Sequence, residues 1–207
     1  MAPWHITNAT TPLPSPDTLS SAFSLRAPPG TDLWDSPPDT CIFTAPLVYQ
    51  AMPLAAFKRA QVTITGDLHA PYAQAGLALV WGGSDGRRRW VKTGMECLAG
   101  RQVVATVGKD RWPDCSVGGV VPRVEASKQV TLEVVRQGFS LEIFQLHRTQ
   151  HGEWQRTILR ELTWVFAAQG GEREGCWAGV YVANPSSEAP EFEVRFEGLV
   201  LEQTENN

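Results

Sequence analysis

The chain has 207 residues, enough for one large domain or two small ones, and one is favoured if the chain is all β. Its formal net charge is −4 and its basic residues are scattered apart from Arg87, Arg88 and Arg89, which argues against nucleic-acid binding. No apolar run reaches the roughly 18 residues that a membrane span needs, and the N-terminus has neither the basic nor the apolar part of a secretion signal. We therefore expect a cytoplasmic protein that binds neither nucleic acid nor membranes. The sequence does not predict an oligomeric state.

The candidate metal and thiol sites are weak. The cysteines are far apart and form no C-x-x-C pair: Cys41, Cys97, Cys115 and Cys176. We expect buried thiols rather than disulfides or zinc ligands. His147 and His151 flank a turn at a strand end, which is not the spacing of two ligands on one helix face. We expect neither a metal nor an organic cofactor.

Residues 1–22 are rich in Pro, Ser and Thr, a composition that favours extended backbone over helix. Trp4 suggests that this segment packs against a folded body. We therefore expect an extended N-terminal segment at residues 1–22 and a single domain at residues 23–207.

From residue 41 onward, apolar and polar residues alternate with period two, which predicts β-strands. The strongest stretches are residues 61–69, 72–81, 88–98, 101–108, 129–147, 176–184 and 192–203. Glycine-rich residues 82–86 and the pair Gln137-Gly138 predict hairpin turns. Residues 155–169 have a loose helical spacing, with a strand as the alternative. The pattern predicts an all-β protein, either a two-sheet sandwich or a closed barrel.

Several stretches, taken in order, carry a family resemblance: PPGTDLWDSP, YAQAGLALVW, RWVKTGMECLAGRQVVATVGKDRW, GVYVANPS and FEVRFEGLVL. They resemble the concanavalin-like jelly-roll family of unknown function that includes the yeast regulator-of-enolase protein, over roughly residues 23–201. The W-x-K-x-G-x-E run, with Q-A-G before it, is the specific part. The chain departs from the family at Ala73, where an Asp is usual. The resemblance implies one antiparallel jelly-roll β-sandwich with a concave sheet face of the kind that often binds ligands.

The run RRWVKTGMECL, residues 88–98, predicts a strand with two different faces. One face is apolar: Val91, Thr93, Met95 and Cys97. The other carries Trp90, Lys92 and Glu96. The same alternation on strands that the resemblance makes neighbours adds Tyr72, Gln74, Trp177 and Tyr181. Aromatic walls with a few polar groups are typical of a small-molecule pocket, although cross-strand pairs on a plain solvent face are the alternative.

The charged members suggest a chemistry. Lys92 would donate to a developing oxyanion or carbonyl, and burial would lower its pKa. Glu96 would act as a base or orient a ligand hydroxyl. Alanine at Trp90, Lys92 or Glu96 is expected to abolish activity and to leave thermal stability nearly unchanged. The paired carboxylates of concanavalin-like glucanases, in an E-x-D-x-x-E strand, are missing from the sequence.

These features lead to three functional hypotheses. The first is a cofactor-free enzyme that binds a hydrophobic, oxygenated small molecule, an isomerase or cyclase of specialised-metabolite biosynthesis that includes pericyclic, cycloaddition-type chemistry. The second is a lectin-like carbohydrate-binding module. The third is a non-catalytic regulatory protein that binds a protein partner.

Overall fold

The computed structural model describes residues 2–82, 87–118, 128–167 and 175–204. Within these ranges, no helix has the length and apolar character needed to cross a membrane. The cytoplasmic location expected from the sequence stays a prediction.

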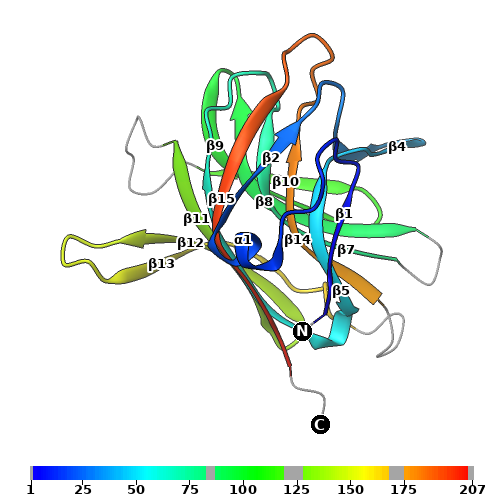
Figure 1. Cartoon of the computed structure of the whole chain (residues 1–207). Helices are drawn as coiled ribbons and strands as arrows, with labels where there is room; N and C mark the ends of the chain where they lie inside the picture. Colours follow the sequence, from blue (N-terminus) through cyan, green and yellow to red (C-terminus); the bar gives the residue numbers. More distant parts are fainter. Residues whose placement is uncertain (1, 83–86, 119–127, 168–174, 205–207) are drawn as a thin grey trace.

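Strands dominate the chain, as the period-two alternation predicts (Figure 1). The elements are β1 (Trp4–Thr7), α1 (Pro16–Ser21), β2 (Ala22–Ala27), β3 (Leu33–Ser36), β4 (Thr40–Phe43), β5 (Leu47–Pro53), a 3-10 turn η1 (Leu54–Ala56), β6 (Phe57–Thr65), β7 (Gln74–Gly82), β8 (Arg88–Leu98), β9 (Arg101–Lys109), β10 (Pro113–Gly118), β11 (Gln129–Gln137), β12 (Ser140–Arg148), β13 (Trp154–Leu162), β14 (Gly175–Ala183) and β15 (Phe192–Gln203).

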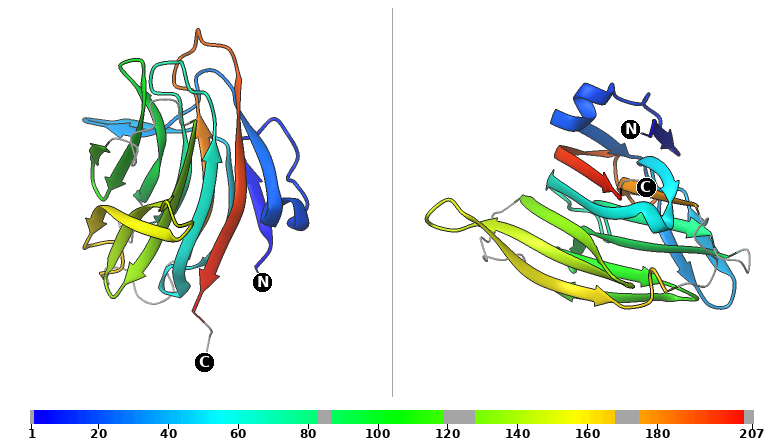
Figure 2. Two further views of the ribbon diagram at one scale, coloured as in Figure 1. Left: turned by 90° about the vertical axis from the view of Figure 1, so that its left-hand side faces the viewer. Right: turned by 90° about the horizontal axis from the view of Figure 1, so that it is seen from below.

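Two large antiparallel sheets form the body. The seven-stranded sheet has the order β1-β5-β14-β7-β8-β9-β10, and the six-stranded sheet has the order β13-β12-β11-β6-β15-β2. Their strands are twisted and curved, and the β12–β13 hairpin extends beyond the body (Figures 1 and 2). Each sheet keeps two edge strands, so the fold is an open jelly-roll β-sandwich and the closed-barrel alternative is wrong.

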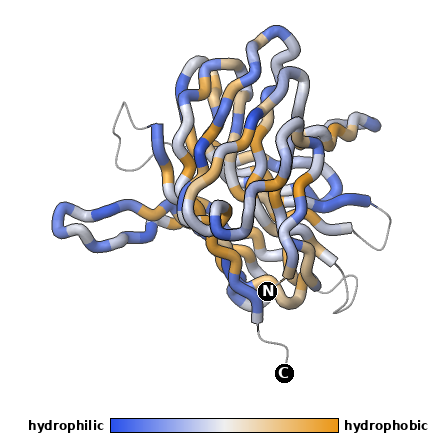
Figure 3. Tube along the Cα trace, viewed as in Figure 1, coloured by the Kyte–Doolittle hydropathy of each residue, from blue (hydrophilic) through white to orange (hydrophobic). Residues whose placement is uncertain are grey.

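The main core fills the space between the two sheets, because alternate residues of each strand point inward. In β8 these are Val91, Met95 and Cys97, which are almost fully buried, as the alternation predicts. Val62 and Ile64 of β6 meet them from the other sheet. Hydrophobic stretches accordingly gather in the middle of the molecule, and the projecting β12–β13 hairpin is mostly hydrophilic (Figure 3).

The N-terminal segment packs on the body, but it is not extended throughout. β1 pairs with β5 at the edge of the seven-stranded sheet. Residues 16–21 form the short helix α1, contrary to the expectation that Pro and Ser prevent one. Ser15 caps the helix by accepting a hydrogen bond from the Thr18 N–H, Pro16 occupies the first turn, and Leu19 is buried. Proline is tolerated at this position because no intrahelical donor is lost there.

The remaining local predictions have mixed outcomes. Gln137-Gly138 makes the predicted hairpin between β11 and β12, with Gly138 at φ 60°. β13 is a strand and residues 163–167 form turns, so the helical interpretation is wrong for residues 155–167. Residues 168 and 169 lie outside the described residues. β7 and β8 pair as the predicted hairpin, and the turn residues 83–86 lie outside the described residues.

The cysteines form no disulfide. Cys97 and Cys176 are buried, as expected. Cys41 and Cys115 are exposed, which corrects the expectation of burial for these two.

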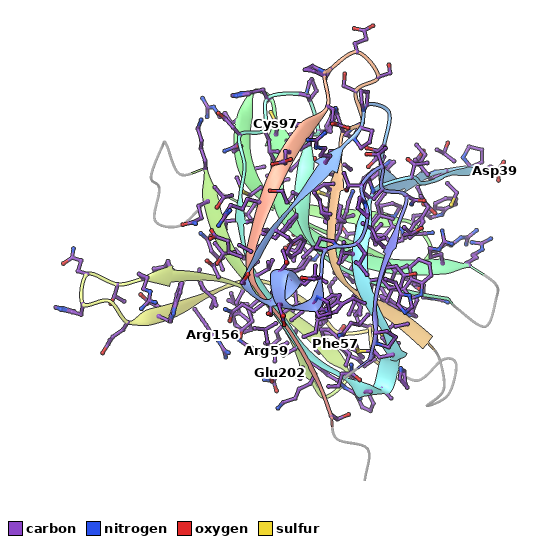
Figure 4. The ribbon with its side chains drawn as sticks, in the orientation of Figure 1. Asp39, Phe57, Arg59, Cys97, Arg156 and Glu202 are labelled. Carbon is purple, nitrogen blue, oxygen red and sulfur yellow. The ribbon has the colours of Figure 1, made fainter. Side chains whose placement is uncertain are left out.

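One small element stands apart from both large sheets. β3 and β4 pair only with each other, from Leu33 opposite Phe43 to Ser36 opposite Thr40. We call residues 33–43 the β3–β4 hairpin. Its tip, marked by Asp39, projects from the body (Figure 4). Its base packs against the outer face of the seven-stranded sheet, the face turned away from the other sheet.

Candidate functional site

The outer face of the seven-stranded sheet carries a second buried cluster. Leu33 of the hairpin packs there with side chains of β5, β7, β8, β9 and β14: Leu47, Ala78, Val80, Trp90, Val107 and Tyr181. Trp90 and Lys92 lie on this face, as the alternation predicts, but they are only 1% and 2% exposed. The hairpin covers them, so they neither line an open pocket nor belong to a plain solvent face.

Lys92 makes two hydrogen bonds beneath the hairpin. Its Nζ donates to the Leu33 carbonyl oxygen at 2.7 Å and to Gln74 Oε1 at 2.7 Å. The carboxylate of Asp32 lies 3.8 Å from the same nitrogen. Tyr181 Oη also donates to Gln74 Oε1, at 3.1 Å, so one amide oxygen ties strands β7, β8 and β14 together.

Three aromatic rings surround the Lys92 ammonium. Its Nζ lies 5.4 Å from the ring centroids of Trp34 and Trp90, and 5.9 Å from that of Tyr181. These distances fall within the range of cation–π attraction. The rings offset part of the cost of removing an ammonium group from water.

Glu96 belongs to the same region through the sheet register. It lies opposite Gln74 across β7 and β8, and it is half-buried. We call this set the Lys92 cluster: Asp32, Trp34, Gln74, Trp90, Lys92, Glu96 and Tyr181.

The pKa values of the charged groups in the cluster are moved closer together. Burial lowers the pKa of Lys92 from its usual 10.5, although the charges of Asp32 and Glu96 oppose this. Burial raises the pKa of Asp32 above 3.8 and that of Glu96 above 4.5, with Lys92 acting in the opposite direction on both. Groups with shifted pKa values that share one place are frequent in sites of proton transfer and charge stabilisation.

The raised pKa of Glu96 predicts a pH effect on stability. The ionised carboxylate is less favourable in the folded chain than in the unfolded one, and this cost disappears as the pH falls through the raised pKa. We compare the unfolding free energy of the wild type with that of Glu96→Gln. As the pH is lowered from neutral to 4.5, the difference should change in favour of the wild type, and below pH 4.5 it should stay constant. Melting curves of both proteins across this range measure the difference. Glu188→Gln, on an exposed loop, is the control, and a wild-type-to-variant difference that does not change with pH would contradict the prediction.

Two glycines face each other across strands β7 and β8 beside Lys92. Gly76 and Gly94 are cross-strand partners on the outer face. A Cβ on Gly94 would lie 2.1 Å from the Ala75 carbonyl oxygen, and one on Gly76 would lie 2.0 Å from that of Thr93. Only glycine fits at these two positions, so the glycine of the W-x-K-x-G-x-E run sets the strand spacing on which Lys92 and Gln74 depend.

Two of the predicted site residues lie at the border of the cluster. Tyr72 has a φ of 62°, precedes β7, and is 55% exposed. Trp177 is half-buried on the outer face, where it stacks on Tyr49 at 4.4 Å between ring centroids. The structure brings together Gln74, Trp90, Lys92, Glu96 and Tyr181, and it packs Trp177 against the buried outer-face cluster that contains Trp90 and Tyr181. The Tyr72 side chain stays exposed, while its carbonyl oxygen accepts a hydrogen bond from Gln74 Nε2 at 3.2 Å.

Asp32 and Trp34 were missed as members of the site. The signal for them was the T-D-x-W motif, which carries the family resemblance but has no strand alternation of its own. The structure places that motif against the W-x-K-x-G-x-E run and the glutamine of Q-A-G. Ala73 instead lies in the core between the sheets, so the departure from the family pattern falls outside the Lys92 cluster.

Within the part of the chain that the structure describes, no three His, Cys, Asp or Glu side chains gather as a metal site would require. His147 instead contacts Gln155 at 3.2 Å. The expectation that the protein needs no cofactor stays a prediction.

The fold and its outer-face cluster define the class: a jelly-roll β-sandwich with a buried polar and aromatic cluster on one sheet. Residues 11–204 match the family described as "Protein of unknown function (DUF1349)". The chain belongs to this family, as the resemblance in the sequence predicts.

The relatives agree with this assignment. The chain is 38% identical over 207 residues to the uncharacterized protein AN7484 of Emericella nidulans, covering 100% of this chain and 98% of that one. A functionally unknown protein from Saccharomyces cerevisiae superposes with a TM-score of 0.71 at 18% identity, covering 98% and 97% of the two chains.

Two further solved structures share the fold alone. The alginate lyase from Klebsiella pneumoniae superposes with a TM-score of 0.58 at 9% identity, covering 88% of this chain and 81% of the lyase. The GH43 BlXynB protein from Bacillus licheniformis superposes with a TM-score of 0.56 at 13% identity, covering 84% of this chain and 31% of that protein.

Proposed function

We propose that this protein is a cofactor-free enzyme that acts on a hydrophobic, oxygenated small molecule at the Lys92 cluster. The reaction is an isomerisation or cyclisation, including pericyclic ring closure, within the biosynthesis of a specialised metabolite. Lys92 donates to an oxygen of the substrate, and Glu96 accepts a proton or orients a hydroxyl group. Trp90 and Tyr181 provide the apolar surroundings.

One observation carries this proposal: a lysine ammonium that is only 2% exposed, with shifted carboxyl groups beside it. Stability alone does not require such a group, because replacing a whole buried ion pair by well-packed apolar residues is often neutral or stabilising. A buried donor surrounded by aromatic rings is instead well suited to stabilising negative charge that develops on a substrate oxygen.

The magnitudes are adequate for catalysis without a nucleophile. Removing a single preorganised oxyanion donor costs enzymes about 10²- to 10³-fold in rate. Holding a flexible substrate in one reactive conformation adds several kcal/mol more, on the order of 7 to 11 in the best intramolecular cases. Pericyclic ring closure needs no catalytic nucleophile, so these two contributions suit it.

The lectin-like alternative receives less support from the outer face. Sugar-binding surfaces present open aromatic faces, whereas Trp90 is buried and Trp177 stacks on Tyr49. The regulatory alternative, with a protein partner, stays a prediction.

A ligand screen tests the proposal. Thermal-shift and native mass-spectrometry measurements would set polycyclic terpenoid and polyketide precursors against soluble oligosaccharides. We expect an apolar oxygenated precursor to bind the wild type. Lys92→Met should lose binding, and Glu96→Gln should bind without turnover. Glu188→Gln is the control variant. Binding of oligosaccharides alone, or of precursors equally well by Lys92→Met, would contradict the proposal.

A further inference from the structure

Both buried lysines of the described chain bind the same small element, the β3–β4 hairpin. Lys92 donates to the Leu33 carbonyl oxygen, and Lys109 donates to the Asp35 carboxylate. Lys109 also donates to the Arg88 carbonyl oxygen at 2.7 Å. Leu33 and Asp35 are alternate residues of β3, and both are buried against the sheet. Two ammonium groups from β8 and β9 thus hold one strand down.

The hairpin is joined to the body only at its base and by side chains. At the base, the N–H groups of Thr44 and Ala45 donate to the Asp32 carbonyl oxygen, and the N–H of Thr31 donates to that of Asn184. Neither strand of the hairpin pairs through backbone hydrogen bonds with a strand of the two large sheets. The hairpin can therefore move about its base without breaking a strand pair of the sandwich, as hinged segments do.

The surface beneath Leu33 combines apolar side chains with a hydrogen-bond donor. Val80, Trp90, Val107 and Tyr181 surround the place where Leu33 packs, and the Lys92 ammonium lies beside it with the Asp32 carboxylate 3.8 Å away. Leu33 presents a carbonyl oxygen to that donor and a branched aliphatic chain to those walls. These are the two features of an apolar molecule that bears a carbonyl group.

We propose that the β3–β4 hairpin occupies the ligand site in this structure and that Leu33 stands where the ligand binds. The ligand is an apolar molecule with a ketone or aldehyde oxygen, which replaces the Leu33 carbonyl as the acceptor of the Lys92 hydrogen bond. Binding requires the hairpin to swing away from β8 and β9. This inference rests on the proposed function, for which it names the substrate class and the movement that admits it.

Lysine acetylation followed by peptide mass spectrometry tests the movement without a ligand. The lysines of the chain are Lys58, Lys92, Lys109 and Lys128. The side chains of Lys58 and Lys128 are each 58% exposed, so they serve as internal references for reagent activity. Modification of Lys92 then reports on the opening of the hairpin.

Asp35→Asn is the test variant, because it removes the carboxylate that Lys109 holds. Glu133→Gln is its matched control. Glu133 is a carboxylate that is 1% exposed and is paired with Arg59 and Arg156 on the outer face of the six-stranded sheet, away from the hairpin. Both variants lose a buried ion pair, but only one loses contact with the hairpin.

Lys92 should react about tenfold or more faster in Asp35→Asn than in the wild type, since losing one partner of a buried pair strongly weakens the structure it holds. In Glu133→Gln, the Lys92 rate should stay at the wild-type value. Equal rates of Lys92 acetylation in Asp35→Asn and the wild type would overturn the proposal that the hairpin is a movable cover over Lys92. An equal rise in Glu133→Gln would also overturn it, because general unfolding would then explain the exposure.

Two small probes of the same shape test the ligand class. The bicyclic ketone 2-decalone should protect Lys92 of Asp35→Asn from acetylation, whereas decalin, which lacks the carbonyl group, should protect it much less. If Lys92 is acetylated faster in Asp35→Asn and 2-decalone does not slow this reaction, the proposed substrate class is overturned. The movement of the hairpin would still be supported. Equal protection by decalin would overturn the role of Lys92 as the donor to the ligand.

Discussion

Trp90→Ala should lower the stability of the protein by about 3 to 5 kcal/mol, the usual cost of removing a buried tryptophan side chain. Trp90 is 1% exposed and is among the largest fully buried side chains of the described residues. For a chain of this size, the melting temperature should fall by roughly 6 to 20 °C. Thermal and urea denaturation of the variant and the wild type measure the loss.

Trp154→Ala makes the same chemical change at a position that is 51% exposed on β13. It should leave the melting temperature almost unchanged. A small effect of Trp90→Ala, similar to that of the control, would mean that the hairpin does not bury this ring in solution. The sequence pattern predicted such a small effect, because it placed Trp90 on an open face.

Lys92→Met should destabilise the protein at neutral pH by about 3 kcal/mol, because it removes one partner of a buried ion pair. The Leu33 carbonyl oxygen loses its donor, and the Asp32 carboxylate loses its counter-charge at 3.8 Å. The methionine side chain refills most of the volume, so lost polar partners rather than a cavity cause the change. Urea denaturation measures the free energy of unfolding.

A double-mutant cycle with Asp32→Asn isolates the charge interaction. The loss of unfolding free energy in the double variant should be smaller than the sum of the two single losses, by about 1 kcal/mol or more. The reason is that the double variant no longer contains an Asp32 carboxylate without its counter-charge. Lys58→Met, which breaks an exposed pair with Glu202, is the control and should change stability little. Additive losses in the cycle would show that Asp32 and Lys92 are not coupled.

The alternation of side chains predicted much of the site. In a regularly paired strand, successive residues face opposite sides of the sheet, so every second residue lies on the same face. Trp90, Lys92 and Glu96 in β8, and Gln74 and Tyr181 across the sheet, lie on the face that the pattern assigned to them. Parity fails for Tyr72 because its positive φ reverses the chain just before β7.

The cover over the site could not be predicted in the same way. The β3–β4 hairpin is short and bounded by prolines, and its strands pair with no strand of the sandwich. Its position depends on contacts between residues far apart in the sequence, such as Lys92 with Leu33. A single sequence contains the T-D-x-W motif but does not show what it packs against.

The separate pairing of β3 and β4 also affects how the sequences of family members can diverge. Changes of length or side chain in a strand of either large sheet disturb a register that several neighbours share. The hairpin shares no such register, so its residues can be replaced or lengthened while the sandwich stays intact. Under the proposed function, exchanging this one segment over a common framework would give family members different ligand selectivities.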